Sequence, residues 1–295
     1  MCIVQAPFGM LRHHTQTVRY HLMKHITYII LFSLVFSCSN NNDINYTLTL
    51  DNDGITVEVF DTTVKDENRF NFNNKIFTVG TKFIYNYEFI SKDGDSLLIN
   101  VKNNNWTFIP KNNSDSTTIT RIDLDVKNGL KPIIDQLPDY NQTIISYTLK
   151  PLPYYNLTGV VENEANIWIH PPRAYLFEIL ELNPFPYVKY PLKVGEKWEW
   201  TLNIGGQWSD PRWKVWEGNI TNNYNYEITD NLDLETKFGK VRCYIIYATA
   251  KSELGITKLR AVFNEKLGFI ELNYQNIDNS IINLNLTDKI DKNGV

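Results

Sequence analysis

Side chains that could bind a ligand gather in one stretch of this 295-residue chain. Six of the seven tryptophans lie from residue 168 to residue 216. Indole faces stack on sugar rings or cover acyl chains, and arginine binds carboxylate or phosphate groups. The residues that we predict to line such an aromatic groove are Trp168, His170, Arg173, Trp208, Arg212, Trp213 and Trp216. Tryptophans can instead form core, and we expect this of Trp198 and Trp200, which lie on the apolar face of an alternating segment.

The composition leaves few residues for metal or nucleophilic chemistry. Four of the five histidines precede residue 26, so His170 is the one histidine in the body of the chain. A zinc site built on two or three histidines is excluded there, and no nucleophile elbow, phosphate-binding loop or dinucleotide fingerprint occurs. Cys243 lies in an apolar segment and is expected to be a core residue. We therefore expect a protein without catalytic residues, cofactor or bound metal.

Chemistry based on carboxylates alone stays open as an alternative. Glu178 and Glu181 would share a face if residues 173–182 form a helix, and paired carboxylates roughly 5–10 Å apart can hydrolyse glycosides. Acidic residues are scattered along the chain, however, so we expect these two to be solvated surface charges. The formal net charge of −4 gives no basic surface, and no nucleic acid is predicted as a partner.

The first 43 residues are typical of a targeting segment. Lys24 and His25 precede the apolar stretch 26–36, which is too short to span a bilayer but fits the core of a signal peptide. Leu34-Val35-Phe36-Ser37-Cys38 then resembles the lipobox of bacterial lipoproteins. We predict an extension upstream of the true start at 1–22, a signal peptide at 23–37 and a lipidated tether at 38–53. A secretory signal with an incidental cysteine, a single-pass anchor and a long leader are the alternatives.

The lipobox resemblance implies a chemistry for one atom, the Cys38 sulfur. It would receive a diacylglyceryl group, the signal peptide would be cut before Cys38, and the new amino terminus would be acylated. Two or three acyl chains hold a protein firmly at a membrane, at about 0.8 kcal/mol per buried CH₂. Ser39, with no acidic residue directly after Cys38, favours the outer membrane. We therefore expect an envelope protein that is attached to the membrane by a lipid anchor.

Beyond residue 46 the hydrophobic pattern has a period of two. Segments with one apolar face occur at 83–89, 198–204 and 282–286, whereas residues 241–250 are apolar on both faces, as in a central strand. Short helices are expected at 126–137 and 173–182. Many short strands in series predict a mostly β fold, with an antiparallel, curved sheet or half-barrel and few short helices.

Two segments of the chain echo each other. Phe77–Tyr85 and Leu192–Trp200 share Val-Gly-x-Lys followed by two aromatic residues with one residue between them. A glycine permits a sharp turn, and the two aromatic residues then lie on the same face of the strand that follows. The echo indicates either a duplicated β unit or a recurrent turn into a strand. On the first interpretation, the chain contains a β-rich unit at 54–150 and a second, with the aromatic cluster, at 151–295.

The second half also resembles uncharacterised β-rich bacterial lipoproteins. The resemblance covers roughly residues 190–275 and is carried by Gly195–Trp198, Phe238–Tyr244 and Leu267–Ile270. It implies a strongly curved antiparallel sheet like the half-barrels of lipoprotein carriers, and it supplies no activity. Our leading hypothesis is a non-catalytic binding or assembly module of the cell envelope, with a lipid, a saccharide or an envelope protein as its partner. A structural envelope subunit without a ligand is the first alternative, and a carboxylate-dependent hydrolase is the second.

Overall fold

The computed structural model describes residues 45–61, 63–103, 105–131 and 140–291. The chain divides into one unit of residues 1–44 and a second of residues 45–295. The predicted extension, the signal peptide and Cys38 therefore lie outside the described residues, and the lipid anchor stays a prediction.

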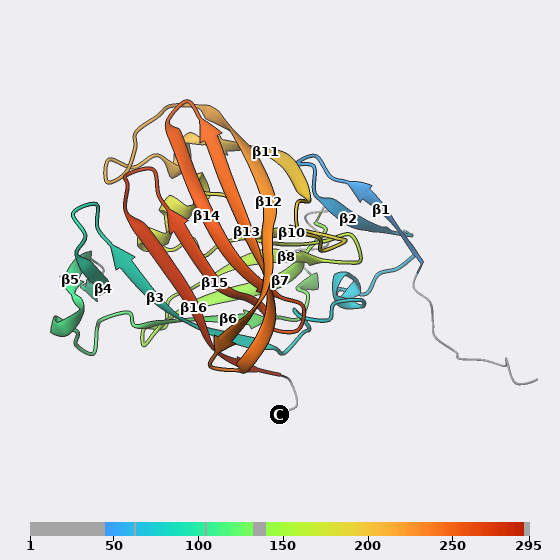
Figure 1. Ribbon diagram of the computed structural model, residues 1–295, viewed down its shortest axis with the longest axis horizontal. Coiled ribbons are helices and arrows are strands. Elements are labelled where there is room, and N and C mark those ends of the chain that lie inside the picture. The colour runs from blue at the N-terminus through green and yellow to red at the C-terminus, as the bar shows by residue number, and fades with distance from the viewer. Residues whose placement is uncertain (1–44, 62, 104, 132–139, 292–295) are drawn as a thin grey trace, which may run out of the picture. The chain divides into compact units, whose positions relative to one another are not determined.

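Antiparallel strands dominate the described part of the second unit (Figure 1). The strands are β1 (Tyr46–Leu50), β2 (Thr56–Phe60), β3 (Lys82–Ile90), β4 (Ser96–Lys102), β5 (Asn105–Pro110), β6 (Arg121–Val126), β7 (Thr143–Lys150), β8 (Tyr155–Glu162), β9 (Asn166–Ile169), β10 (Tyr187–Lys189), β11 (Lys197–Gly205), β12 (Asn219–Thr236), β13 (Gly239–Ser252), β14 (Gly255–Asn264), β15 (Gly268–Gln275) and β16 (Ile281–Ile290). The helical segments that lie wholly within the described residues are 3₁₀ turns, namely η1 (Arg69–Asn71), η2 (Lys111–Asn113), η3 (Tyr175–Leu182) and η4 (Gly206–Trp208).

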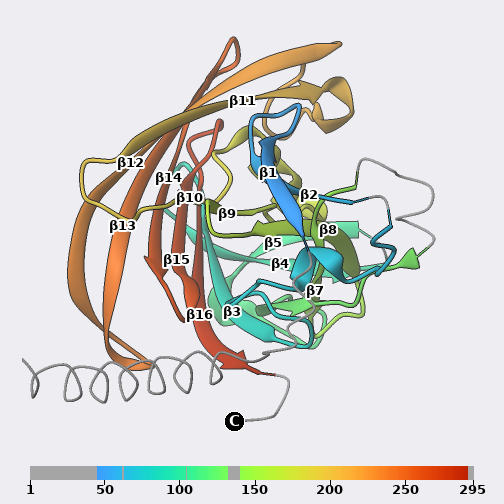
Figure 2. The same ribbon diagram turned by 90° about the vertical axis from the view of Figure 1, so that its right-hand side faces the viewer.

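Within the described residues, fourteen strands form one antiparallel sheet. Its order is β10-β9-β8-β7-β6-β3-β16-β15-β14-β13-β12-β11, with the β4–β5 hairpin branching from β3. The sheet is nearly closed into a barrel, and Figure 2 shows its long strands bending. The prediction of a mostly β, antiparallel, curved fold with few short helices is confirmed.

Aromatic side chains bridge the two end strands of this sheet. The ring of Tyr187, on β10, lies 6.0 Å from the ring of Trp198 and 6.3 Å from that of Trp200, both on β11. Aromatic pairs within 4.5–7 Å attract each other beyond the area that they bury. These contacts hold the end strands together without backbone hydrogen bonds.

The period of two in the sequence corresponds to one buried face of each strand. On β3, the side chains of residues 83, 85, 87 and 89 are buried, as successive residues point to opposite faces of a sheet. On β13, Ile246 and Ala248 belong to the main core, while Cys243 and Ile245 belong to a separate small cluster. Residues on both faces of this central strand are therefore buried, as predicted, and burial raises the pKa of the Cys243 thiol.

The two echoing segments form the same turn. Thr81 N–H donates to Thr78 O at 3.0 Å and Glu196 N–H donates to Lys193 O at 3.1 Å. The third residue of each turn is a glycine with positive φ, +94° at Gly80 and +92° at Gly195, as a type II turn requires. Each glycine N–H then donates to the neighbouring strand, to Val126 O from Gly80 and to Ile228 O from Gly195. The echo is therefore a recurrent turn into a strand, whether or not it arose by duplication.

Of the two predicted helices, one is found in part and the other does not begin at the predicted residue. Residues 175–182 of the segment 173–182 form η3, whose tight turns belong to a 3₁₀ helix. No helix begins at Val126, because this residue ends β6, where its N–H donates to Thr81 O. Residues 132–137 of that predicted helix lie outside the described residues.

The predicted boundary at residues 150/151 falls between β7 and β8, which pair as neighbours in the one sheet. Strands from both predicted units belong to this sheet. Residues 46–50 of the predicted tether form β1, and its hairpin with β2 is fixed by Asn163 and Asn166, whose amide groups donate to Thr56 O at 3.0 Å.

Candidate functional site

A cavity of about 330 Å³ brings four of the predicted groove residues together. Its lining comes from the end of β9 and the loop after it, from η3, β11 and η4, and from the β1–β2 turn. The predicted residues in this lining are Trp168, His170, Arg173 and Trp208. Polar neighbours that the prediction did not include are Asp51, Asp53, Gln142, Glu181, Asn203 and Gln207.

Backbone hydrogen bonds fix the loop that carries His170. The His170 N–H donates to Gly159 O at 3.1 Å, and the Tyr147 hydroxyl donates to His170 O at 2.8 Å. Pro171 and Pro172 follow and are buried. A residue before proline avoids the helical region, so the loop stays extended and holds Arg173 beside His170.

The tip of η3 is pinned on the opposite side of the cavity. Leu182 O accepts hydrogen bonds from Asn222 Nδ2 at 3.0 Å and from Thr257 Oγ1 at 2.8 Å. Asn183 Nδ2 donates to Gln275 O at 3.0 Å. Strands β12, β14 and β15 thus hold the two residues that directly follow Glu181, which positions that carboxyl group.

His170 and Glu181 form a buried pair of neutral groups. His170 Nε2 lies 3.4 Å from Glu181 Oε1, and their side chains are 12% and 5% exposed. Burial, together with the nearby Arg173 charge, lowers the pKa of His170 to about 3, and burial raises the pKa of Glu181 to about 8. Because a carbonyl only accepts, His170 Nδ1 donates to Pro171 O at 2.9 Å, which leaves Nε2 as an acceptor.

Arg173 brings a positive charge to this neutral pair. Its Nη1 lies 3.4 Å from His170 Nε2 and its Nη2 donates to Leu157 O at 3.4 Å. Among the described residues, no carboxylate lies within 4.0 Å of the Arg173 guanidinium. The guanidinium carbon lies 5.9 Å from the centre of the Trp208 ring. Arg173 therefore keeps donor capacity for a ligand.

Two polar atoms on residues of the lining are buried without a hydrogen bond within the described part of the chain. These are Trp168 Nε1 and Glu181 Oε1, on residues that are 5% and 4% exposed. Buried polar groups are nearly always hydrogen-bonded, and leaving one unpaired is costly. Both atoms are covered by protein and are not open to the cavity, and Glu181 Oε1 faces His170 Nε2 at 3.4 Å.

Trp198 and Trp200 are core, as predicted. They are 7% and 5% exposed, and their rings stack on Tyr226 and Tyr224 at centroid distances of 5.3 and 4.5 Å. Trp200 Nε1 donates to the Tyr226 hydroxyl at 2.9 Å. Trp200 also contributes to the cavity lining, so the core directly supports the site.

The remaining predicted residues lie elsewhere. Arg212 and Trp213 line a second cavity, of about 580 Å³, with Trp106 and Phe108. The Arg212 guanidinium lies between the rings of Trp106 and Trp213, at 4.2 and 4.9 Å, and donates to both Asp210 carboxylate oxygens at 2.7 and 2.6 Å. The Arg212 guanidinium is therefore engaged with Asp210 and the two rings rather than with a ligand. Trp216 is 8% exposed and is not part of the lining of either cavity.

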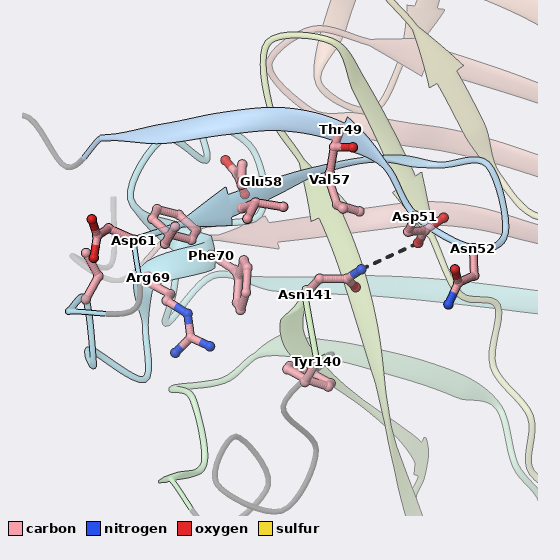
Figure 3. A pocket seen from close by; sticks show the side chains of 13 residues that line it. Thr49, Asp51, Asn52, Val57, Glu58, Asp61, Arg69, Phe70, Tyr140 and Asn141 are labelled. Carbon is pink, nitrogen blue, oxygen red and sulfur yellow. Dashed lines mark hydrogen bonds between the residues drawn. The ribbon is translucent and has the colours of Figure 1, made fainter.

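Two polar groups in the lining of a larger cavity of the described unit are engaged with the protein. In the cavity of about 510 Å³ in Figure 3, the Arg69 guanidinium lies 4.7 Å from the Phe70 ring, and Asn141 donates to Asp51. Glu58 points into the same region, where burial raises its pKa to about 7. That lining contains no tryptophan within the described residues. The indoles and Arg173 therefore favour the smaller cavity as the candidate site.

The prediction that Glu181 is a solvated charge is wrong. Glu181 is 4% exposed, whereas Glu178 is half-buried. In this 3₁₀ helix residues three apart lie on one face, so Glu178 and Glu181 share a face. Glu181 lies beside Leu182, where the chain is held against β12 and β14, and this packing takes it out of water. The sequence analysis did not predict Asp53 as a groove residue because it assigned this residue to the lipidated tether at 38–53.

Across the described residues, no cluster of three or more histidine, cysteine, aspartate or glutamate side chains has the arrangement of a metal site. In the same part of the chain, no helix is long and apolar enough to cross a membrane.

Comparisons with known proteins find similarity in solved structures alone. No family model matches the chain, and no curated protein matches it. A candidate lipoprotein from Parabacteroides distasonis is 9% identical over 72% of this chain and 96% of its own, with a TM-score of 0.39. A candidate exported protein with a YmcC-like fold from Bacteroides fragilis is 10% identical over 75% and 98%, also at 0.39.

The hypothetical lipoprotein YmcC from Escherichia coli is 9% identical over 79% of this chain and 100% of its own, with a TM-score of 0.33. At these identities and TM-scores, the likeness establishes neither a family nor a function for this chain.

Proposed function

We propose that this protein is a lipid-anchored, non-catalytic binding module of the bacterial cell envelope. It is attached to the outer membrane through Cys38 and holds a small amphipathic or saccharide ligand in the cavity lined by Trp208 and Arg173. The lipobox sequence at residues 34–38 supports the anchor. The observation that carries the binding role is that the half-buried Trp208 and the Arg173 guanidinium, which has no carboxylate partner among the described residues, line the same cavity.

The site is suited to binding because its polar groups are held in place before a ligand arrives. Hydrogen bonds to the backbone fix the His170 loop, and strand side chains fix the end of η3. A preorganised site loses less entropy on binding than a flexible one. The half-buried Trp208 forms part of the lining and contributes an aromatic surface.

Native mass spectrometry of the full chain, purified from a bacterial envelope in mild detergent, tests the binding role. We expect one bound small molecule per chain and its loss in Trp208→Ala. Trp216→Phe is the matched control, since Trp216 is not in the lining, and it should keep the adduct. A protein that is empty in every preparation and co-purifies with another envelope protein would support the structural alternative.

A carboxylate-dependent glycosidase is the second candidate function. Glu181 has a pKa raised by burial to about 8, so it is protonated near pH 7 as a general acid must be, and Asp53 lines the same cavity. Release of reducing ends from an envelope polysaccharide, abolished by both Glu181→Gln and Asp53→Asn, would establish this function. Absence of release by the wild type would leave the binding role.

A further inference from the structure

We infer that the ligand of this cavity is a small zwitterion, whose anionic group binds the Arg173 guanidinium and whose ammonium group binds the Asp53 carboxylate. The inference rests on the proposed function and names the ligand class of the same site. Two opposite charges that line one cavity without being paired carry it. A dipeptide with free termini and a phosphoethanolamine headgroup share this chemistry.

The Arg173 guanidinium supplies the positive charge of the lining. One of its N–H groups points from Nη1 toward His170 Nε2 and one donates from Nη2 to Leu157 O, each at 3.4 Å. Its other N–H groups have no partner in the described part of the chain. A guanidinium with free N–H groups binds carboxylate or phosphate oxygens through parallel, charge-assisted hydrogen bonds.

The Asp53 carboxylate, in the β1–β2 turn, supplies the negative charge. Among the described residues it has no ion-pair partner, Arg173 included, and burial together with the nearby Asp51 charge raises its pKa. Asp51 itself is engaged, because its carboxylate accepts the N–H groups of Asp53 and Ile55 at 3.0 and 2.9 Å and the Asn141 amide at 3.5 Å. An ammonium group beside Asp53 would favour its ionised form and offset the repulsion by Asp51.

The two opposite charges are held on separate elements and do not form a pair. Backbone hydrogen bonds close the turn, from Asp51 N to Ile55 O at 2.9 Å and from Gly54 N to Asp51 O at 3.1 Å, and Arg173 follows the proline loop. A ligand with a single charge would leave one of the two groups unpaired, whereas a zwitterion complements both.

The other titratable side chains of the lining add no charge to this pair. His170 is neutral because burial lowers its pKa to about 3, and Glu181 is neutral near pH 7 because burial raises its pKa to about 8. The free charges of the lining are therefore one cation and one anion, which does not favour a simple anion or a simple cation as the ligand.

The size and the aromatic wall suit a molecule of dipeptide size. A volume of about 330 Å³ lies at the lower end of the usual range for small-molecule sites, about 300–1,000 Å³. The guanidinium carbon of Arg173 lies 5.9 Å from the centre of the Trp208 ring. A carboxylate on Arg173 would therefore bring the neighbouring side chain of the ligand close to this half-buried indole, where an aromatic side chain packs well.

Isothermal titration of the full chain in maltoside micelles tests the inference, with alanyl-phenylalanine as the probe. Its N-acetyl derivative lacks the ammonium group and its C-terminal amide lacks the carboxylate. We expect the free dipeptide to bind, each derivative to bind about 10-fold more weakly, and the affinity to fall with added salt. Phosphoethanolamine, with ethyl phosphate as its form without an ammonium group, is titrated in parallel and distinguishes a lipid headgroup from a peptide.

Variants of Arg173 assign the anionic group of the probe. Arg173→Gln should weaken binding of the free dipeptide about 10-fold and remove its advantage over the C-terminal amide, whereas Arg173→Lys keeps the charge and should lose less. Arg242→Gln is the matched control, because this exposed arginine pairs with Asp233 and is absent from the lining. The control should bind as the wild type does.

A variant of Asp53 assigns the ammonium group. Asp53→Asn should weaken binding of the free dipeptide about 10-fold and remove its advantage over the N-acetyl derivative. Asp93→Asn is the matched control, because Asp93 also precedes a glycine with positive φ in an exposed turn but is absent from the lining. Thermal unfolding of each variant shows whether it is folded.

The outcomes distinguish this inference from the proposed function. A derivative without one charge that binds as tightly as its parent, or binding of neither probe while native mass spectra show another adduct, would overturn the zwitterion and keep the binding role. No binding of either probe and no adduct would overturn both. Weaker binding of each derivative, cancelled by the matching variant, would support both.

Discussion

His170 and Glu181 illustrate, at the residue scale, how burial decides the state of a side chain. They lie 3.4 Å apart, close enough for an ion pair if both were charged. Burial instead keeps both neutral near pH 7, because a charged form would lose its hydration without a sufficient partner. The pair is therefore a hydrogen-bonding surface rather than a salt bridge.

This assignment predicts how stability depends on pH. In the folded state Glu181 keeps its proton up to about pH 8, while the unfolded chain releases it near the ordinary pKa of 4.5. The folded state then binds more protons, so the free energy of unfolding falls as pH rises, by up to about 1.4 kcal/mol per pH unit. Glu58, with a pKa of about 7, adds to this slope below pH 7.

His170 acts in the opposite direction at lower pH. Its pKa is about 3 in the folded state against 6.5 ordinarily, so it makes stability rise with pH between those values and not above them. The window from pH 7 to 8 therefore excludes His170, and comparison with Glu181→Gln cancels the contribution of Glu58, which both proteins share. Denaturant unfolding should show the wild type losing about 1 kcal/mol across this window relative to Glu181→Gln. Parallel slopes for the two proteins would show that Glu181 is ionised when folded.

At the element scale, the turns at Gly80 and Gly195 set where β3 and β11 begin. Both have glycine at the third position with positive φ, and both donate to the adjacent strand. The turn before β11 therefore positions Trp198 and Trp200, and these rings reach Tyr187 at the other end of the sheet.

Substitution of Gly195 tests the turn. A Cβ at this position would meet no atom within 4 Å, so only the backbone conformation opposes a side chain. Gly195→Ala should lower the free energy of unfolding by about 1–2 kcal/mol, and Gly195→Asn by less, because asparagine tolerates the left-handed region. Thermal unfolding measures both; an alanine variant as stable as the wild type would contradict the turn assignment.

The aromatic bridge between the end strands gives a second prediction. Trp200→Ala removes a ring that is 5% exposed and stacked on Tyr224, and it should cost about 3–5 kcal/mol. Trp208→Ala should cost much less, because Trp208 is half-buried. Equal costs in denaturant titrations would mean that Trp200 is not part of a packed core.

Part of this structure could be predicted from the sequence because strands leave a periodic pattern. The alternation at residues 83–89 and the two apolar faces around Cys243 gave the right elements. Contacts between distant segments leave no such pattern, so the join between β10 and β11 was not predicted. The burial of Glu181 was missed because the charge was judged on its type rather than on its apolar neighbours.

Four residues of the candidate site were also predicted from the sequence. Trp168, His170, Arg173 and Trp208 lie around one cavity. Arg212 lies apart because Asp210, two residues away, captures its guanidinium. Composition shows that arginines are present, but local pairing decides which one is available.

At the scale of the whole molecule, the proposal joins a lipid anchor to a binding unit. Cys38→Ala should release the protein from membranes into the soluble fraction and abolish labelling with radioactive palmitate, because acylation requires the sulfur. Cys243→Ala is the control; it removes a buried thiol in the sheet and should leave anchoring unchanged. Full membrane retention of Cys38→Ala would refute the anchor.

The central claim is that the cavity lined by Trp208 and Arg173 holds a ligand. The measurement that tests it most directly is a crystal structure of the protein purified in mild detergent from a bacterial envelope, without added ligand. We predict electron density for a small molecule in contact with the Trp208 ring and within hydrogen-bonding distance of the Arg173 guanidinium. A cavity filled by the protein's own side chains, with Arg173 paired to a neighbouring carboxylate, would contradict the claim.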